Sequence, residues 1–185
     1  MSAQFDVVAI VGSLRRDSLT KRLLGALIEV SPPSLRIENV PLAELALYNP
    51  DLEVEPPQPW TAFRERVLRA DGVLFATPEY NRSMPAPLKN ALDVGSRPPG
   101  KNVWDGKPAA VVSASPGAMG GFGANHHLRQ SLVFLNMPTL QQPEAYIGHV
   151  DRLLDEKGAF RDESTRAFLG SFMQAFEGWL KRLVG

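Results

Sequence analysis

Three short apolar runs place the strongest constraint on the fold of this chain. They span residues 7–11, 73–77 and 109–114, and each is apolar along nearly its whole length. Uninterrupted runs of this kind are typical of strands buried on both faces, as in a parallel sheet that is covered by helices. Each run is followed by a helical pattern, at about residues 18–30, 85–93 and 124–135. The alternation predicts an α/β fold built on a doubly wound parallel sheet.

The remaining segments complete this pattern. Residues 35–40 alternate between apolar and polar side chains, which indicates an edge strand. We expect further helices at residues 60–70 and 162–183 and a last strand within residues 139–147. Residues 41–59 contain five prolines and no periodic pattern, which predicts a long irregular loop. No linker interrupts the chain, so residues 1–185 are expected to form a single domain.

The loops that follow the three apolar runs are the candidate functional segments. They span residues 13–18, 78–83 and 115–123. Ligands of doubly wound sheets bind in the crevice outside the carboxyl ends of the strands. We therefore expect the three loops to meet in one crevice.

The first loop has the chemistry of an anion pocket. After Gly12 it offers hydroxyl and guanidinium groups, and the amides of a helix N-terminus follow directly. The groups expected to converge on a phosphate are those of Ser13, Arg15, Ser18 and Thr20. The loop has neither the three glycines of a dinucleotide fingerprint nor a Walker sequence. The alternative interpretation is an ordinary capped helix with solvated arginines.

The other two loops indicate a flat ligand. The second loop presents the ring of Tyr80 beside Asn81, and the third is rich in glycine, which allows a ligand to approach the backbone closely. A phosphate pocket, a strip of backbone donors and a glycine-lined wall together suit a flat heterocycle on a phosphorylated tail. Flavin mononucleotide (FMN) is the natural candidate.

Composition excludes several classes of function. Lys plus Arg equals Asp plus Glu, at 20 each, so no net charge draws the chain to nucleic acid or to an anionic membrane. Cysteine is absent, which removes disulfides and thiolate chemistry, and the three histidines lack metal-ligand spacing, so no metal site is predicted. We find no signal segment and no apolar run near the ~20 residues that span a bilayer, and we expect a cytoplasmic protein.

The chain also resembles the NAD(P)H-dependent FMN reductases, a family that includes quinone, chromate and azo-dye reductases. The resemblance lies in ordered stretches over nearly the whole chain. These are residues 12–15 with Ser18, residues 78–83 followed by 88–93, and residues 115–117 with Gly120 and Gly121.

This resemblance implies a flavodoxin-like five-stranded sheet with strand order 2-1-3-4-5 and helices on both faces. It places the FMN phosphate on Ser13, Arg15, Ser18 and Thr20. It also implies a homodimer or homotetramer with the flavin near a subunit boundary. Family members often have Asn at the position of Thr20 and Gly-Val at the positions of Ala86 and Pro87. The residues that would border the isoalloxazine ring are Pro78, Glu79, Tyr80 and Asn81 on one side, with Ser115 and Gly117 on the other.

The implied activity is electron transfer from NADPH or NADH, through bound FMN, to a small acceptor such as a quinone, a flavin, a metal oxyanion or an azo compound. No residue is predicted to act as a dedicated acid or base, because the cofactor carries the chemistry. The groups expected to meet the nicotinamide cofactor or the acceptor are Arg15, Arg82 and Gly120.

Two other functions compete with this one. A flavodoxin-type electron carrier would have the same cofactor, but such carriers are usually strongly acidic, whereas this chain is neutral. A phosphoacceptor domain needs a cluster of aspartates at the strand ends, where this chain has Gly12, Thr77 and Ser113.

Some residues near the motifs are better explained by structure than by chemistry. Glu79 is more readily a loop or subunit contact than an acid, and Tyr80 suits a ligand or an interface equally. Lys89 and Asn90 are expected on an exposed helix face, and the tryptophans are expected to serve packing.

Overall fold

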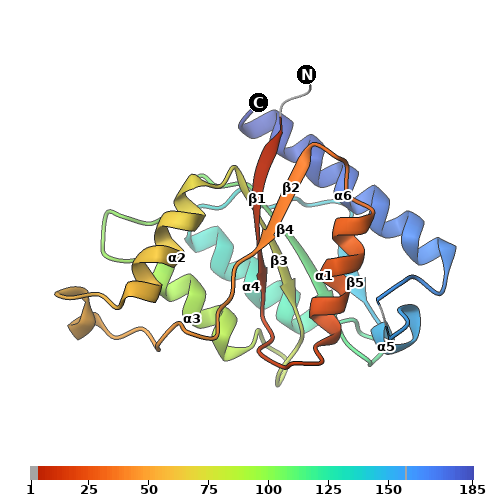
Figure 1. Cartoon of the computed structure of the whole chain (residues 1–185), viewed down its shortest axis with the longest axis horizontal. Helices are drawn as coiled ribbons and strands as arrows, with labels where there is room; N and C mark the ends of the chain where they lie inside the picture. The colour runs from red at the N-terminus through yellow and green to blue at the C-terminus, as the bar shows by residue number, and fades with distance from the viewer. Residues whose placement is uncertain (1–3, 157) are drawn as a thin grey trace.

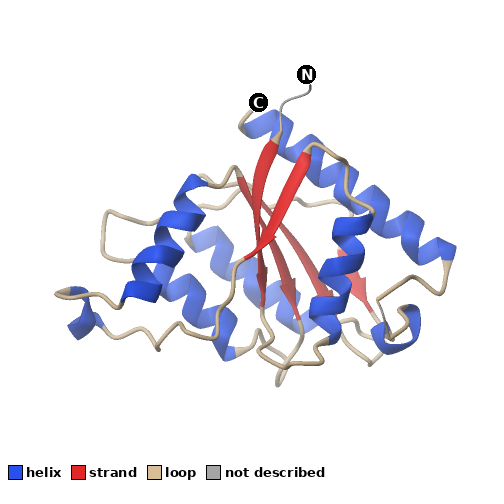
Figure 2. Ribbon diagram, in the orientation of Figure 1, coloured by secondary structure: helices blue, strands red, loops and turns tan. Residues whose placement is uncertain are grey.

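The computed structural model describes residues 4–156 and 158–185. It contains a five-stranded parallel sheet in the order β2-β1-β3-β4-β5, which confirms the predicted topology (Figures 1 and 2). Residues 1–3 and Lys157 belong to the predicted domain but lie outside the described residues. The strands are β1 (Phe5–Val11), β2 (Leu35–Asn39), β3 (Gly72–Thr77), β4 (Ala109–Ala114) and β5 (Ala145–Ile147).

The helices follow the strands as the periodicity predicts, within a few residues at each end. The short 3-10 helix η1 inside the long loop was not predicted. The helical elements are α1 (Leu19–Glu29), η1 (Pro50–Glu53), α2 (Gln58–Arg69), α3 (Ala86–Gly95), α4 (Phe122–Phe134), α5 (Val150–Leu153) and α6 (Glu163–Leu183).

The sheet separates two apolar clusters. Alternate side chains of β1 point to opposite faces, so Val7 and Ala9 join one cluster while Val8 and Ile10 join the other. The first cluster, which we call the α1 layer, also contains residues of α1, α5 and α6. The second, the α4 layer, contains residues of α2, α3 and α4. Burial on both faces explains why the central strands are apolar throughout.

The parallel register brings the carboxyl ends of the strands to one edge. Val11 pairs with Ala76, Thr77 pairs with Ser113, and Ala114 pairs with Ile147. The arrowheads of β1, β3, β4 and β5 therefore point to the same side of the molecule, at the lower edge in Figure 2. The three candidate loops all leave the sheet at this edge.

The long loop between β2 and α2 is held in place by Asn90. The Asn90 amide accepts a hydrogen bond from the Tyr48 N–H at 2.8 Å and donates to the carbonyls of Leu45 at 3.2 Å and Ala46 at 3.0 Å. Asn90 is only 6% exposed, so the prediction that it lies on an exposed helix face is wrong. The buried amide satisfies the backbone of a segment that has no regular structure of its own.

Tryptophan packing is confirmed on this side of the sheet. Trp60 and Trp104 are completely buried. The Trp60 indole donates to the Ala46 carbonyl at 3.0 Å and stacks on Tyr48 with ring centroids 5.4 Å apart. The irregular loop is thus fastened by two side chains from neighbouring helices.

Candidate functional site

The three predicted loops line one pocket of about 130 Å³ at the carboxyl edge of the sheet, which we call the strand-end pocket. Every residue proposed to hold FMN lines it except Asn81 and Gly117. The lining residues are Ser13, Arg15, Ser18, Leu19, Thr20, Pro78, Glu79, Tyr80, Ala114, Ser115, Pro116 and Val150.

The first loop brings hydroxyl groups and helix amides to the same wall. Ser18 caps α1, because its side-chain oxygen accepts a hydrogen bond from the Lys21 N–H at 3.2 Å. The first amides of the helix, those of Leu19 and Thr20, have no acceptor within the helix. The partial positive charge of the helix N-terminus adds to these donors, and together they suit a phosphate group.

Two residues of this wall are mostly covered, but their hydroxyl oxygens are not among the buried unpaired atoms of the described residues. Ser13 is 6% exposed and Thr20 is 3% exposed. Within the described ranges, the side chain of neither residue makes a hydrogen bond to the protein. Two hydroxyls on one pocket wall that have no protein partner can donate hydrogen bonds to a ligand that accepts them. The residues therefore fit the phosphate of FMN.

Arg15 lies at the rim of the same wall. Its side chain is exposed and, among the described residues, forms no ion pair. A guanidinium group that is not engaged elsewhere can form a bidentate contact with a phosphate.

The second loop is a tight turn whose polar groups bind one another. Tyr80 and Ser83 exchange two backbone hydrogen bonds, each 3.0 Å long. Asn81 and Arg82, between them, have φ angles of 50° and 64°, the combination that defines a type I′ turn. Their side chains do not line the strand-end pocket.

Side chains also fasten this turn to α4. The Glu79 carboxylate accepts a hydrogen bond from the Ala124 N–H at 3.1 Å and lies 3.8 Å from the Arg82 guanidinium. His127 on α4 is 2.9 Å from the Ser83 hydroxyl. The structural role favoured for Glu79 is therefore present within the chain, in addition to its place on the pocket wall.

The glycines of the third loop serve close packing. A Cβ atom at Gly120 would lie 2.5 Å from the Tyr146 carbonyl carbon, and the φ of Gly120 is 58°. The Gly117 N–H donates to the Ser115 hydroxyl at 3.0 Å. Gly117 and Gly120 do not line the strand-end pocket, whereas Ser115 does.

Four lining residues were missed by the sequence reasoning. Leu19, Ala114 and Pro116 each adjoin a predicted residue, so their position in the chain could have indicated them. Val150 begins the short helix after β5, and its apolar side chain carries no chemical signal.

Titratable groups with shifted pKa values lie away from this pocket. Burial, helped by a hydrogen bond to Glu144, raises the pKa of Tyr146 to about 12. The described residues contain no group of three or more His, Cys, Asp or Glu side chains that could hold a metal. They also contain no helix with the length and apolar character needed to cross a membrane.

Comparison with known proteins places these features in context. Residues 5–151 match the family model described as NADPH-dependent FMN reductase. A quinone reductase from Pseudomonas putida is 54% identical over 182 residues, which cover 98% of this chain and 97% of that protein. A 2-hydroxy-1,4-benzoquinone reductase from Burkholderia sp. is 42% identical, over 95% of this chain and 96% of its own length. The solved structure of FerB, a flavoenzyme NAD(P)H:(acceptor) oxidoreductase from Paracoccus denitrificans, superposes with a TM-score of 0.92 at 37% identity, covering 97% of this chain and 98% of that one.

Proposed function

The chain belongs to the NADPH-dependent FMN reductase family, and on this premise we propose that it reduces quinones with FMN held in the strand-end pocket. It is an FMN-dependent NAD(P)H oxidoreductase with a flavodoxin-like fold. The names of its relatives, a quinone reductase and a 2-hydroxy-1,4-benzoquinone reductase, support a quinone as the acceptor. Residues 1–185 would act as one FMN-binding domain.

The observation that carries the placement of FMN is the pair of hydroxyls on the pocket wall, those of Ser13 and Thr20, that have no partner among the described residues. Ser13 and Thr20 would donate hydrogen bonds to the FMN phosphate, together with Ser18 and the first amides of α1. Arg15 would pair with the same phosphate from the rim. When bound there, FMN would supply the redox chemistry, hydride acceptance from the nicotinamide and two-electron transfer to the acceptor.

The other walls would hold the isoalloxazine ring. Pro78, Glu79, Tyr80 and Ser115 line the pocket on loops after β3 and β4, and in the proposal they border the ring. Asn81 and Gly117 would contribute through the backbone beside these residues. The fixed turn of the second loop keeps this wall in one position, so little reorganisation is needed when the ring binds.

The side chains and backbone of this protein would bind and orient FMN, the nicotinamide cofactor and the acceptor. The proposal assigns no side chain a proton-transfer role. Arg15 and Arg82 would meet phosphates of the nicotinamide cofactor, and Gly120 would lie beside the acceptor. Arg82 has most of its side chain exposed, which leaves it accessible to a diffusible cofactor.

The electron-carrier alternative is less well supported. Carriers that dock on basic partners need an acidic surface, and this chain has a formal net charge of zero. A reductase that is fed by a diffusible nicotinamide cofactor needs no such charge.

The proposal also includes a homodimer or homotetramer in the cytoplasm. Exposed large apolar side chains support an oligomer, since such residues often mark contacts between proteins. Phe134 is 89% exposed and Val133 is 77% exposed, side by side near the end of α4. Light scattering would give the oligomeric state, and cell fractionation would give the compartment, where reduced nicotinamide cofactors must be available.

A spectroscopic experiment tests the main proposal. FMN-loaded protein under anaerobic conditions should lose its yellow colour on addition of NADPH and regain it when a benzoquinone is added. Initial rates with NADPH and quinone varied together should give parallel double-reciprocal lines. Protein that cannot be reconstituted with FMN, or reduced protein that a quinone fails to reoxidise, would overturn the proposal.

Acceptor preference is measured in the same assay. Rates with benzoquinone, chromate, an azo dye and free FMN should differ, with the highest kcat/KM for the quinone. A higher kcat/KM for any of the other acceptors would contradict the assignment of the substrate.

A further inference from the structure

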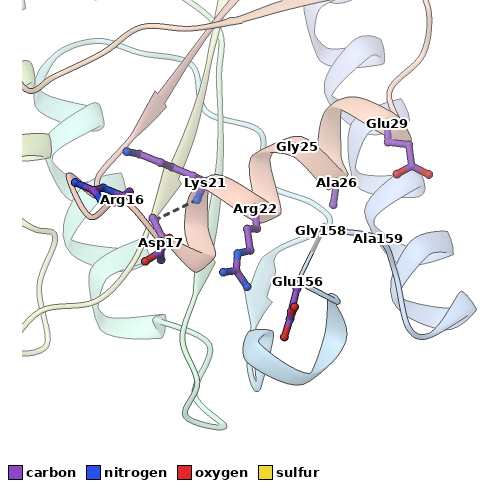
Figure 3. Close-up of a pocket in the computed structure, with 11 residues that line it drawn as sticks. Arg16, Asp17, Lys21, Arg22, Gly25, Ala26, Glu29, Glu156, Gly158 and Ala159 are labelled. Carbon is purple, nitrogen blue, oxygen red and sulfur yellow. Dashed lines mark hydrogen bonds between the residues drawn. The ribbon is translucent and has the colours of Figure 1, made fainter.

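Helix α4 differs from the other long helices in its lack of charge. Among Lys, Arg, Asp and Glu, its sequence contains only Arg129. In contrast, α1, α2, α3 and α6 each carry charges of both signs, and the side chains of Lys21, Arg22 and Glu29 extend from α1 in Figure 3. A helix without charges on its outer side is typical of a helix that is covered on both sides.

The side chain of Arg129 is engaged within the protein. Its Nε donates to the Asn125 side-chain oxygen at 2.8 Å, and its Nη1 donates to the Leu140 carbonyl at 2.9 Å. Asn125 is completely buried. The one charged side chain of α4 therefore contributes little to the solvation of its outer side.

The exposed side chains of α4 form a strip that is mostly apolar and aromatic, which we call the α4 strip. Phe122 is 43% exposed, and its ring centroid lies 4.2 Å from that of His126 and 5.2 Å from that of Tyr146. Two turns after His126, most of Val133 and Phe134 is exposed. Exposed apolar groups that lie together often mark a contact with another protein. The strip consists of Phe122, His126, His127, Gln130, Val133 and Phe134.

The α4 strip is symmetric about Gln130. His126 and His127 lie one helical turn before this residue, and Val133 and Phe134 lie one turn after it. Residues three or four apart share one side of a helix, so these side chains are neighbours. When a second copy of α4 crosses at Gln130 in the opposite direction, each His126 meets the partner's Phe134 and each His127 meets the partner's Val133. A surface that matches itself after a two-fold rotation suits an isologous contact.

We propose that the α4 strip is an interface between two copies of this chain, packed antiparallel across a two-fold axis at Gln130. A second copy is the favoured occupant, because the strip matches itself and has no charge that would select a charged partner. Its uncharged, aromatic composition is that of the buried centre of an interface. The inference deepens the proposed function, which includes a homo-oligomer without a surface assigned to it.

Helix α4 also anchors the second loop of the strand-end pocket. The Ala124 N–H holds the Glu79 carboxylate, and His127 lies 2.9 Å from the Ser83 hydroxyl. His127 is exposed and belongs to the strip, so a second copy would shield the His127–Ser83 hydrogen bond from water. Association should therefore stabilise the turn at residues 80–83. This consequence for the ring wall rests on the proposed function, whereas the interface itself needs no bound cofactor.

Disulfide trapping tests the contact and its register. The chain has no cysteine, so one introduced thiol can crosslink only with the same position of another copy. Under mild oxidation of dilute protein, most of the Gln130→Cys variant should form a covalent dimer, because the two thiols lie at the axis. Gln174→Cys is the matched control, since Gln174 is an exposed glutamine of α6, and it should stay uncrosslinked. Equal crosslinking of the two variants would overturn the contact at Gln130.

A charge placed in the strip gives a second readout. Phe134→Lys removes an exposed aromatic ring and should lower the molar mass in light scattering to about half that of the wild-type protein. Leu183→Lys is the matched control, because Leu183 is an exposed apolar residue of α6, and it should leave the mass unchanged. A monomeric wild-type protein, or a Phe134→Lys variant with the wild-type mass, would show that the strip is not an interface.

Hydrogen exchange tests the link to the second loop. The amides of Tyr80 and Ser83, which bond to each other's carbonyls, should exchange several-fold faster in Phe134→Lys than in the wild-type protein, while the amides of α6 exchange equally. Unchanged exchange at Tyr80 and Ser83 in a variant of halved mass would overturn the link and leave the interface in place. If the protein takes up no FMN or fails to reduce quinone, the proposed function fails instead. Crosslinking and molar mass still decide the interface in that case, because neither needs the cofactor.

Discussion

The first and second loops of the strand-end pocket follow neighbouring strands, yet they use their polar groups in opposite ways. At the first loop and the start of α1, the hydroxyls of Ser13 and Thr20 and the guanidinium of Arg15 have no partner within the described part of the chain. In the second loop, the polar groups from Glu79 to Ser83 bind one another or α4. The first loop therefore has polar groups that are free to bind a ligand, whereas the second loop has a conformation fixed by its own hydrogen bonds. Polar composition alone does not separate the two, because what matters is which groups remain unpaired.

Removing one arginine from each loop should give the largest contrast. Arg15→Ala should weaken FMN binding by about 10- to 100-fold, because a charge-assisted contact to phosphate is lost. Arg82→Ala should change FMN affinity by less than about threefold, since Arg82 does not line the pocket. Fluorescence titration of the apoprotein with FMN measures both constants. Equal losses in the two variants would show that the loops do not differ in this way.

Backbone substitutions test the fixed shape of the second loop. Arg82 has a φ of 64°, a region that costs any residue with a Cβ atom about 1–2 kcal/mol, arginine included, and that β-branched residues tolerate least. Arg82→Val should therefore lower the free energy of unfolding by less than about 1 kcal/mol, whereas Arg82→Gly should not lower it. Denaturant unfolding of both variants provides the measurement. If valine and glycine behave alike, the turn does not depend on its backbone conformation.

Helix caps offer a finer comparison, because one cap faces the pocket and another does not. Ser18→Ala should cost about 1 kcal/mol of stability and also weaken FMN binding several-fold. Asp162→Ala removes the cap of α6, which is far from the pocket lining, and should lower stability while FMN affinity stays the same. Thermal unfolding and FMN titration of the two variants are the paired measurements. A loss of FMN affinity in Asp162→Ala would mean that FMN binding reports general stability instead.

The smallest of the expected effects is the loss of the Asp162 contribution to stability at acidic pH. Hydrogen bonds from the Thr165 and Ser164 hydroxyls, and then from their amides, hold the pKa of Asp162 well below its usual range. Because the pKa is lower in the folded state, this carboxylate stabilises the protein above its unfolded pKa of about 3.9. That contribution is lost as the pH falls toward the folded value. The difference in Tm between the wild-type protein and Asp162→Ala should therefore be constant near neutral pH and should shrink below about pH 4.

Sequence reasoning succeeded where a local pattern determines the structure. The buried strands and the meeting of three loops follow from apolar runs and from the geometry of parallel sheets, whereas the strand order came from the family resemblance. The N-cap role of Ser18 follows from its place before a helical pattern. Most of the pocket lining adjoins the strand ends, and the family resemblance named the individual residues of the second and third loops.

The features that the sequence did not indicate are contacts between distant segments and one turn. Asn90 forms hydrogen bonds with backbone groups more than 40 residues away in the sequence, and no local sequence pattern indicates such partners. Gly120 is required by the backbone of β5, a strand of only three residues that periodicity hardly reveals. The turn at Asn81 and Arg82 has no glycine to mark it. In each case the deciding interaction exists only after the chain has folded.

The sheet divides the core into two clusters, and this affects how the site responds to destabilising substitutions in the core. The first loop leads into α1, in the α1 layer, whereas Glu79 and Ser83 fasten the second loop to α4, in the α4 layer. Truncating Leu27 of α1 and truncating Leu128 of α4 would create voids on opposite sides of a wall of strands. Distant defects of this kind have nearly additive effects on stability. The phosphate end and the ring end of the site therefore pack on different core clusters. A substitution in one cluster can destabilise one end of the site while the other end keeps its conformation.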